Sequence, residues 1–584
     1  MKYKINKHIC CYLLGILINI LFTSNIIAGV QNTFYVSPEG NDNFPGTIEK
    51  PFATVFKAQN VIRKLNKKMH GDIIVYLRGG EYILKSSIQL SNEDSGTNGH
   101  KIIYQAYKNE KPIFTGGLRV NNWKLFDKRL NIYRAKIYGL KDTRQLFING
   151  TRATRARSEN AIGWIDSKDG YSCPSYVEKW NNISDVEVVY QVAWRSLRGP
   201  ISSVSNQNAK MSQDYWRNMR EISKNTDYQE IKSPVWIENA FELLDIEGEW
   251  YFNKKTNYIY YKPRMNEDLQ SVEVIIPSLE TLLYGEYVSN VIFKGITFSY
   301  ATWLQPNTSK GFVHVQASIL SYEGEQMPGN VTFKYSNNIR FENNTFIHLG
   351  ATGLRFSTGS KNNYIYNNIF SDISGSAISV GEVNNSKPSH EDLVINNTID
   401  NNLINKVAVE YLGSTGIFIG YTKGTIIKNN EIRNLPYTSI SVGWGWNNEI
   451  IAGRDNEISY NLIDSGMLIL NDGAAIYTLS SQPGTQVFNN FINNQRNGAG
   501  GLYLDDGSSN MHWYNNVVLN TDIWLNMWTK TIKNNNIENN FFNTKKQVTN
   551  GTNNIIRNNT FVSEYNLPLD AIKIIQNSGR KISP

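Results

Sequence analysis

Short apolar strands separated by paired asparagines recur along the C-terminal half of the chain. From about Asn337 onward the pairs mostly follow one another at intervals of 24 to 33 residues, and Tyr460-Asn461 fills the one gap. One coil of a parallel β-helix has this length and must stack on the next coil to bury its apolar face. Asparagine tolerates left-handed turns, and stacked amides form ladders. The pattern therefore predicts an all-β, right-handed parallel β-helix. The pairs stand at 343–344, 367–368, 396–397, 429–430, 489–490, 515–516, 539–540 and 558–559.

A second phrase of alternating character lies between the asparagine pairs. It recurs as TGLRF, SAISV, TGIFI, TSISV, AAIYT and GGLYL. Strand alternation places the central apolar residue of each phrase inside the helix and its two neighbours outside. The predicted inner column is Leu354, Ile378, Ile417, Ile440, Ile476 and Leu502. The predicted outer columns are a small one, with Gly353, Ala377, Gly416, Ser439, Ala475 and Gly501, and a mixed one, with Arg355, Ser379, Phe418, Ser441, Tyr477 and Tyr503.

The pattern changes in the N-terminal half. Residues 52–65 have apolar positions at helical spacing, which predicts a helix that caps the open end of the solenoid. Between 119 and 286 the asparagine phrase is missing, and alternating runs rich in Trp, Tyr, Arg and Pro predict an inserted β-sandwich-like domain. The expected organisation is a cap with the first coils (30–118), the insertion (119–286), the main β-helix (287–566) and a C-terminal tail or cap (567–584).

The first 29 residues have the pattern of a secretory signal peptide. Three lysines precede the apolar run from Ile9 to Phe22, and small and polar residues follow up to Ala28-Gly29. Cleavage near that point predicts a secreted or periplasmic protein. No later stretch is long and apolar enough to predict a membrane span.

Composition and charge exclude several classes of function. A formal net charge of +8 over 584 residues gives no indication of nucleic-acid binding. The sequence has no glycine-rich phosphate loop, no His/Cys cluster at metal spacing and no nucleophile-elbow serine. We therefore expect no metal and no cofactor, a polysaccharide or oligosaccharide as the partner, and a monomer.

Acidic residues gather near the recurring strands. Asp472 lies in NDGAAIY, Asp505 and Asp506 lie in YLDDGSS, and Glu410 precedes TGIFI. Hydrolysis of a glycosidic bond ordinarily needs two carboxyls, one protonated and one ionised. We expect Asp472 and Asp505 to be this pair, with Glu410 and Asp506 as alternatives. A fully extended path would separate the first two by roughly 23 Å, so the pair requires a sharp turn at 471–473 or after Asp505. Ordinary turn chemistry is the competing interpretation of each acid.

Aromatic residues accompany these acids. Phe418, Tyr477 and Tyr503 belong to the predicted outer column, and Trp444 and Trp446 stand at its rim. Exposed aromatic patches usually mark binding sites, so all five are predicted to bind the substrate. The alternative is that they only cover a sheet face under a loop.

Six phrases in one order resemble glycoside hydrolase family 141. They are DTRQLFINGTRATRAR (142–157), GEWYFNKKTNYIYYKP (248–263), STGIFIGYTKGTIIKNNEI (414–432), SVGWGW (441–446), DGAAIYTLSSQPGT (472–485) and GLYLDDGSS (501–509). The resemblance implies a right-handed β-helix with an inserted sandwich that hydrolyses plant cell-wall glycans, with fucosidase and xylanase activities both known in the family. It also implies catalytic aspartates on the helix surface, which match Asp472 and Asp505 here.

Two other classes of function fit the same fold. A polysaccharide lyase would need a basic residue as the proton acceptor, for which Arg355 and Lys423 are candidates. A non-catalytic carbohydrate-binding or adhesion solenoid would repeat the same surface from coil to coil. Acids and tyrosines are instead concentrated in two adjacent coils, which favours a local site.

Overall fold

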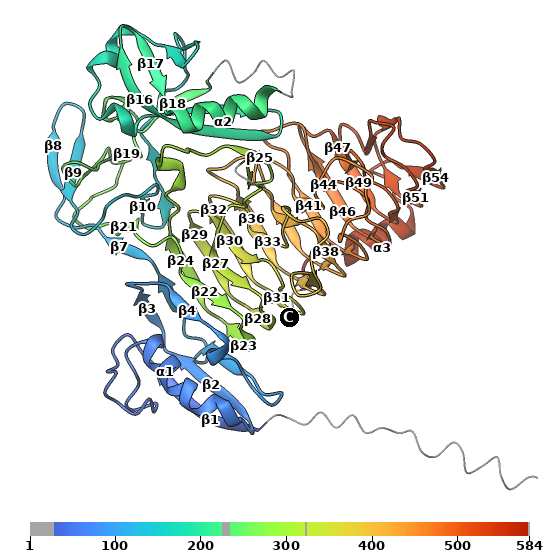
Figure 1. Ribbon diagram of the computed structural model, residues 1–584, viewed down its shortest axis with the longest axis horizontal. Helices are drawn as coiled ribbons and strands as arrows, with labels where there is room; N and C mark the ends of the chain where they lie inside the picture. The colour runs from blue at the N-terminus through green and yellow to red at the C-terminus, as the bar shows by residue number, and fades with distance from the viewer. Residues whose placement is uncertain (1–28, 225–233, 322–323, 582–584) are drawn as a thin grey trace, which may run out of the picture.

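Three parallel sheets wind around one core (Figure 1). The computed structural model describes residues 29–224, 234–321 and 324–581, so residues 1–28 of the predicted signal peptide lie outside the described residues. A 13-stranded sheet runs from β1 (Val30–Val36) to β54 (Ile555–Arg557), and an 11-stranded sheet from β4 (Ile88–Leu90) to β53 (Gln547–Thr549). The third sheet has 12 strands, from β3 (Gly80–Ile83) to β55 (Thr560–Phe561). Each coil adds strands to these sheets, so the predicted parallel β-helix is confirmed.

The predicted inner column is a continuous stack in the 11-stranded sheet. Its six members, from Leu354 to Leu502, are register partners from one coil to the next. All six have a relative exposure of 0%. The strands that carry them include β37 (Ile417–Ile419), β41 (Ile440–Val442), β44 (Ala474–Thr478) and β47 (Gly500–Leu504).

The small column faces inward, so its predicted outward position is wrong. Ala377 belongs to the main core cluster. A Cβ atom added to Gly353 would lie 2.9 Å from Ile373, and one added to Gly501 would lie 2.4 Å from Val518. These residues stand at or next to the start of a strand, where the chain turns from one sheet into the next, so strict alternation does not hold there. Only small residues fit against the neighbouring strand.

Buried asparagines form a ladder through the helix. In each rung a side-chain amide donates to the next coil's amide oxygen at 2.9–3.0 Å. Asn401-Asn402 supplies the rung that the repeat assigned to Asn396-Asn397, and Asn397 instead joins a shorter ladder with Asn363. The residue before most rungs has a positive φ, as the turn requires. The main ladder consists of Asn344, Asn368, Asn402, Asn430, Asn461, Asn490, Asn516, Asn540 and Asn559.

Helices cover parts of the solenoid. Helix α1 (Val55–Leu65) begins at Thr54, whose side chain accepts a hydrogen bond from the Lys57 amide, and it packs Val55, Ala58 and Ile62 on the core. This is the predicted capping helix. The C-terminal segment forms helix α3 (Leu569–Asn577), which packs on β49 (Val517–Thr521) of the 12-stranded sheet. The segment 567–584, predicted as a C-terminal tail or cap, therefore contains a helix.

The insertion interrupts the solenoid between β6 (Pro112–Thr115) and β22 (Leu283–Glu286). It contains sheets of four, five and six mainly antiparallel strands and helix α2 (Gln213–Lys224). Strand β22 pairs with β4, so the β-helix resumes at Leu283, a few residues before the predicted boundary at 287. Figure 1 shows the insertion beside the solenoid. The hairpin of β15 (Glu187–Val192) and β16 (Arg195–Ser205) contacts the solenoid directly, because the Ala193 carbonyl accepts from the Asp472 amide at 2.9 Å.

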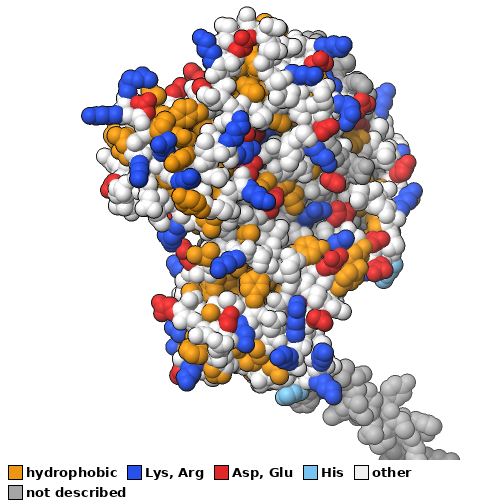
Figure 2. Space-filling model, turned by 60° about the vertical axis from the view of Figure 1, so that its left-hand side comes forward, with side chains coloured by type: hydrophobic (Ala, Val, Ile, Leu, Met, Phe, Trp, Pro, Cys, Tyr) orange, Lys and Arg blue, Asp and Glu red, His pale blue; other side chains and the backbone are white. Residues whose placement is uncertain are grey.

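The surface carries both signs of charge. On the face in Figure 2, lysine and arginine are interspersed with aspartate and glutamate. No helix within the described ranges is long and apolar enough to cross a membrane.

Candidate active site

Asp472 and Asp505 flank two adjacent strands, and their charges interact. Asp472 precedes β44 and Asp505 follows β47, and these two strands are partners in the 11-stranded sheet. The chain turns at 471–472, where both amides donate to the Ala193 carbonyl of the insertion at 2.9 Å. The Tyr437 hydroxyl donates to the Asp472 carbonyl at 2.8 Å. The charge of Asp505 raises the pKa of Asp472, and the Tyr503 hydroxyl interacts with both carboxyls. The turn that the pair requires is present.

The Asp505 carboxylate is held by two donors. Asp505 is only 9% exposed. The Tyr477 hydroxyl donates to Oδ2 and the Trp528 indole donates to Oδ1. Burial raises the pKa of Asp505, and these two donors oppose that rise because they stabilise the ionised form.

The Asp472 carboxyl lies in different surroundings. Burial raises its pKa to about 6, the charge of Asp505 adds to the rise, and the hydrogen bond from Tyr503 opposes it. Asp472 therefore keeps a proton to a much higher pH than an ordinary aspartate. Two neighbouring carboxyls with unequal surroundings are the arrangement that separates a general acid from a general base or nucleophile.

Buried tyrosines support the pair. Burial raises the pKa values of Tyr437, Tyr477 and Tyr503, so their hydroxyls remain neutral donors. Gln316 of β25 (His314–Gln316) donates to the Tyr437 hydroxyl at 3.0 Å.

Three of these residues escaped the sequence analysis. Tyr437 directly precedes the TSISV phrase, and Trp528 directly follows strand β50 (Leu525–Met527), one coil after GGLYL. Extending the coil alignment by a few residues would have found both. Gln316 lies in the short strand β25, which is outside the repeats, and no signal in the sequence marks it.

The two alternative acids have partners elsewhere. Asp506 accepts from the Thr531 hydroxyl at 2.6 Å, in the turn of the next coil. Glu410 accepts from Arg144 at 3.0 Å and Gln145 at 2.7 Å, in the contact with the insertion. Burial alone would raise the pKa of Glu410, but Arg144 and other arginines outweigh it and hold the value at about 2. Glu410 is not part of the Asp472–Asp505 network, and Asp506 acts on Asp505 through its backbone amide and its charge.

The predicted aromatic platform divides into buried and exposed parts. Tyr477 and Tyr503 pack edge to face at 5.2 Å, and both rings are buried, so they contribute hydroxyls rather than stacking faces. Phe418 is 1% exposed, because loops cover this part of the sheet. Trp444 is half-buried between the Phe418 cluster and the tyrosine cluster. Trp446 is 42% exposed and lies 5.0 Å from Trp444.

Trp528 adds an exposed ring that the sequence analysis did not include. It is 48% exposed, and its indole nitrogen contacts Asp505. The exposed indole faces of this region therefore belong to Trp446 and Trp528, on either side of the buried tyrosines in sequence order.

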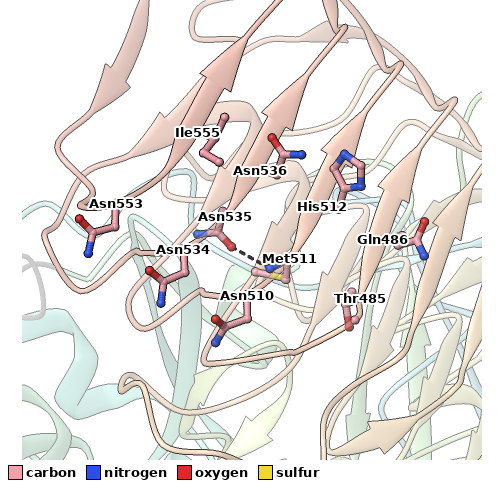
Figure 3. A pocket seen from close by; sticks show the side chains of 11 residues that line it. Thr485, Gln486, Asn510, Met511, His512, Asn534, Asn535, Asn536, Asn553 and Ile555 are labelled. Carbon is pink, nitrogen blue, oxygen red and sulfur yellow. Dashed lines mark hydrogen bonds between the residues drawn. The ribbon is translucent and has the colours of Figure 1, made fainter.

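A separate hollow of about 540 Å³ lies on the 13-stranded sheet near the C-terminus. Figure 3 shows the amide side chains of Asn510, Asn534, Asn536 and Asn553 around it, with His512 on the neighbouring strand. None of the described residues that line it is a carboxylate. It therefore lacks the groups that glycoside hydrolysis requires.

Both a sequence profile and solved structures match this chain. A sequence profile described as the GH141 insertion domain matches residues 135–264. A solved structure described as a glycoside hydrolase superposes with a TM-score of 0.79 and 26% identity, over 94% of this chain and 99% of that chain. A second solved structure, a complex of XylC with xylose, covers 83% of this chain and 69% of that chain at 14% identity and a TM-score of 0.49.

A curated relative matches a shorter segment. Pectate lyase PEL9 of Emericella nidulans is 37% identical over 96 residues, which is 16% of this chain. The chain spans about a fifth (21%) of the length of that relative. The insertion profile and the full-length superposition agree: the chain contains a stretch similar to the GH141 insertion domain and has the parallel β-helix fold of a solved glycoside hydrolase.

Proposed function

We propose that this enzyme cleaves glycosidic bonds in a complex plant cell-wall polysaccharide of pectic or xylan type, with a fucosidase-like or xylanase-like activity. One observation carries the proposal. Asp472 and Asp505, from adjacent coils, share a buried hydrogen-bond network while their surroundings differ. Paired carboxyls of unequal acidity are what hydrolysis of a glycosidic bond requires.

The surroundings suggest a role for each carboxyl. Asp472, with a pKa raised to about 6, is the group that donates a proton to the leaving oxygen. Asp505 accepts hydrogen bonds from Tyr477 and Trp528, which favour its ionised form, so it attacks the sugar or activates a water molecule. The neutral tyrosine hydroxyls keep both groups oriented.

The exposed tryptophans supply the sugar-binding surface. Indole faces stack on the apolar faces of sugar rings, and exposed aromatic patches mark such sites. Trp528 also contacts Asp505, so a sugar that stacks on this ring lies beside the carboxylate. Trp446 supports binding farther along the same surface.

The test is release of monosaccharides from a panel of pectic and xylan oligosaccharides that includes fucosylated ones. On the substrate that the panel identifies, Asp472→Asn and Asp505→Asn should each lose about a hundredfold or more in turnover. The matched control is Asp506→Asn, which removes the adjacent carboxylate and should retain most of the turnover. Near-normal turnover in either member of the pair removes that residue from the mechanism.

A lyase activity is the second candidate, because of the local similarity to pectate lyase PEL9. Of the basic residues considered for it, Arg355 forms an ion pair with Glu382 at 2.9 Å, so its guanidinium group already has a carboxylate partner. An unsaturated product would absorb in the ultraviolet, whereas hydrolysis gives no such product. Absorbance that rises with sugar release would favour the lyase.

We also propose that the enzyme acts outside the cytoplasm. The basic and apolar pattern of residues 1–29 supports this. N-terminal sequencing of the exported protein should find Gly29 or a residue close to it.

A further inference from the structure

A cavity of about 450 Å³ lies where the insertion contacts the solenoid. Its wall carries an unusual number of arginines, three of which come from the run TRATRAR. Strand β18 (Trp236–Glu238) forms another part of the wall, and Glu410, Leu412 and Ile469 of the solenoid complete it. The five arginines are Arg144, Arg152, Arg155, Arg157 and Arg198.

Four of these arginines are paired with carboxylates. Arg144 and Arg155 each contact Glu187 at 2.8 Å, and Arg198 contacts Glu238 at 2.9 Å. Arg152 contacts Asp372 at 2.8 Å. With Glu410 included, four carboxylates line the cavity or pair with its arginine side chains, compared with five guanidinium groups. The guanidinium groups therefore exceed by one the carboxylates that line the cavity or pair with these side chains; Glu249 lies nearby but accepts from the backbone amide of Arg157.

Arg157 supplies that excess. Its side chain is exposed and lies 4.9 Å from the ring of Trp236, and it pairs with no carboxylate of the described residues. The Trp236 ring is itself fixed, because its indole nitrogen donates to Glu238 at 2.8 Å. A guanidinium group held flat against an aromatic ring keeps its donor edge free for an incoming anion.

Buried donors in the cavity wall also lack protein partners. The Nε atoms of Arg155 and Arg198 are buried without a hydrogen bond within the described chain. Both side chains are more than nine-tenths buried. Buried polar groups in folded proteins nearly always have partners, so an oxygen-rich ligand group or its bound water would complete this wall.

The cavity lies close to the carboxyl pair. Ile469 lines the cavity and is three residues from Asp472, a chain length of at most about 11 Å. On the other side, Gln191 lines the cavity and is two residues from Ala193, whose carbonyl binds the Asp472 amide. A sugar bound in the cavity and a sugar at the pair can thus belong to one oligosaccharide.

We propose that this cavity binds an acidic substituent of the polysaccharide, a sugar carboxylate or a sulfate ester, on a residue close to the one that is cleaved. The proposal rests on the proposed function for its choice of a carbohydrate ligand. Arginine binds carboxylate and sulfate-type oxygens through paired N–H donors, which lysine cannot reproduce. The enzyme would therefore select acidic segments of a polysaccharide over neutral ones.

The test measures binding and not turnover. In an Asp472→Asn background, calorimetry compares trigalacturonate, its carboxyl-reduced neutral counterpart and a sulfated galactan trisaccharide. We expect at least one acidic probe to bind tenfold or more tightly than the neutral one. We expect Arg157→Gln to lose that preference and Arg157→Lys to lose part of it. The matched control is Arg134→Gln, because Arg134 also stacks on aromatic rings of the insertion, 4.5 Å from the Tyr258 ring, outside the cavity.

The outcomes separate the two proposals. Preference for trigalacturonate identifies a carboxylate, and preference for the galactan probe identifies a sulfate ester. Equal binding of neutral and acidic probes, absence of binding by both acidic probes, or equal losses in Arg157→Gln and Arg134→Gln would overturn the proposal. Charge-selective binding by a chain whose parent hydrolyses no substrate in the panel would contradict the hydrolase function alone.

Discussion

The Asp472 carboxyl links the proposed catalysis to stability, because the burial that raises its pKa also makes its ionisation costly in the folded chain. In the unfolded chain its pKa is near 3.8, and in the folded chain it is about 6. The folded state therefore binds the proton more tightly. The stability that this group contributes is fully present below pH 3.8 and is lost as the pH rises through 6.

The size of the effect follows from the shift. A difference of about two pKa units corresponds to roughly 3 kcal/mol, an upper value for a side chain that is not fully buried. Asn resembles the protonated carboxyl and cannot ionise. Asp472→Asn should thus gain up to about 3 kcal/mol over the parent at pH 7.5 and nothing near pH 4, while it loses turnover. For a chain of this length that unfolds cooperatively, the gain is a Tm increase of roughly 2–3 °C.

Differential scanning calorimetry of the parent and the variant at pH 4, 6 and 7.5 measures this difference. Asp506→Asn is the control, because it removes the adjacent carboxylate and leaves the pair intact. The reasoning fails if Asp472→Asn is no more stable than the parent at pH 7.5, or if its advantage is the same at all three pH values. A gain of equal size and equal pH dependence in Asp506→Asn would also refute the attribution to Asp472.

Three further predictions test the site and the fold. Tyr503→Phe removes a hydrogen bond that lowers the pKa of Asp472, so the alkaline limb of the kcat/KM profile should move to higher pH, and an unmoved or lowered limb would contradict this. Ile440→Asp puts a charge into the fully buried column and should abolish soluble folded protein. The control Ile440→Val should lower the free energy of unfolding by only about 0.5–1.5 kcal/mol. A soluble Ile440→Asp variant that unfolds cooperatively would show that the column is misplaced. Asn430→Ala removes one rung of the ladder: the side-chain amide nitrogen of Asn402 loses its acceptor and the amide oxygen of Asn461 loses a donor. Urea unfolding should therefore show a loss of about 1–3 kcal/mol. Asn429→Ala, which places alanine at a positive φ, tests the turn without removing the rung.

The repeat made the solenoid predictable from the sequence, because each coil must satisfy the same packing and turn requirements. Ile440 and its column partners could be aligned by their phrases alone, and the structure pairs them as expected. Gly353 and Gly501 were placed on the wrong side, because alternation does not hold where the chain turns into the next sheet. Asn396-Asn397 was assigned to the main ladder because that coil contains two asparagine pairs, and spacing alone does not distinguish them.

The surroundings of the acids were less accessible to sequence reasoning. Asp472 and Asp505 could be proposed as a pair, but their meeting depends on contacts between segments far apart in the chain. The Ala193 carbonyl that fixes the Asp472 loop is a backbone atom of the insertion, so no residue type marks it. Tyr477 and Phe418 were expected to be exposed, because strand alternation points them out of the solenoid. Both are buried, and the repeat does not reveal which strands are covered by loops.

The hairpin turn at Ala193 lies outside the carboxyl pair but influences the position of Asp472. The acid loop belongs to the solenoid, while the atom that fixes it belongs to the insertion. Trp194 of the same turn packs with Leu412, Tyr437 and Met467, which adjoin that loop. Substitutions in the hairpin can therefore change the burial of Asp472, and with it the pH at which the enzyme works, without altering either aspartate. An enzyme of this kind that adapts to a different pH range would therefore change residues of its insertion, while the solenoid that carries the carboxyls remains unchanged.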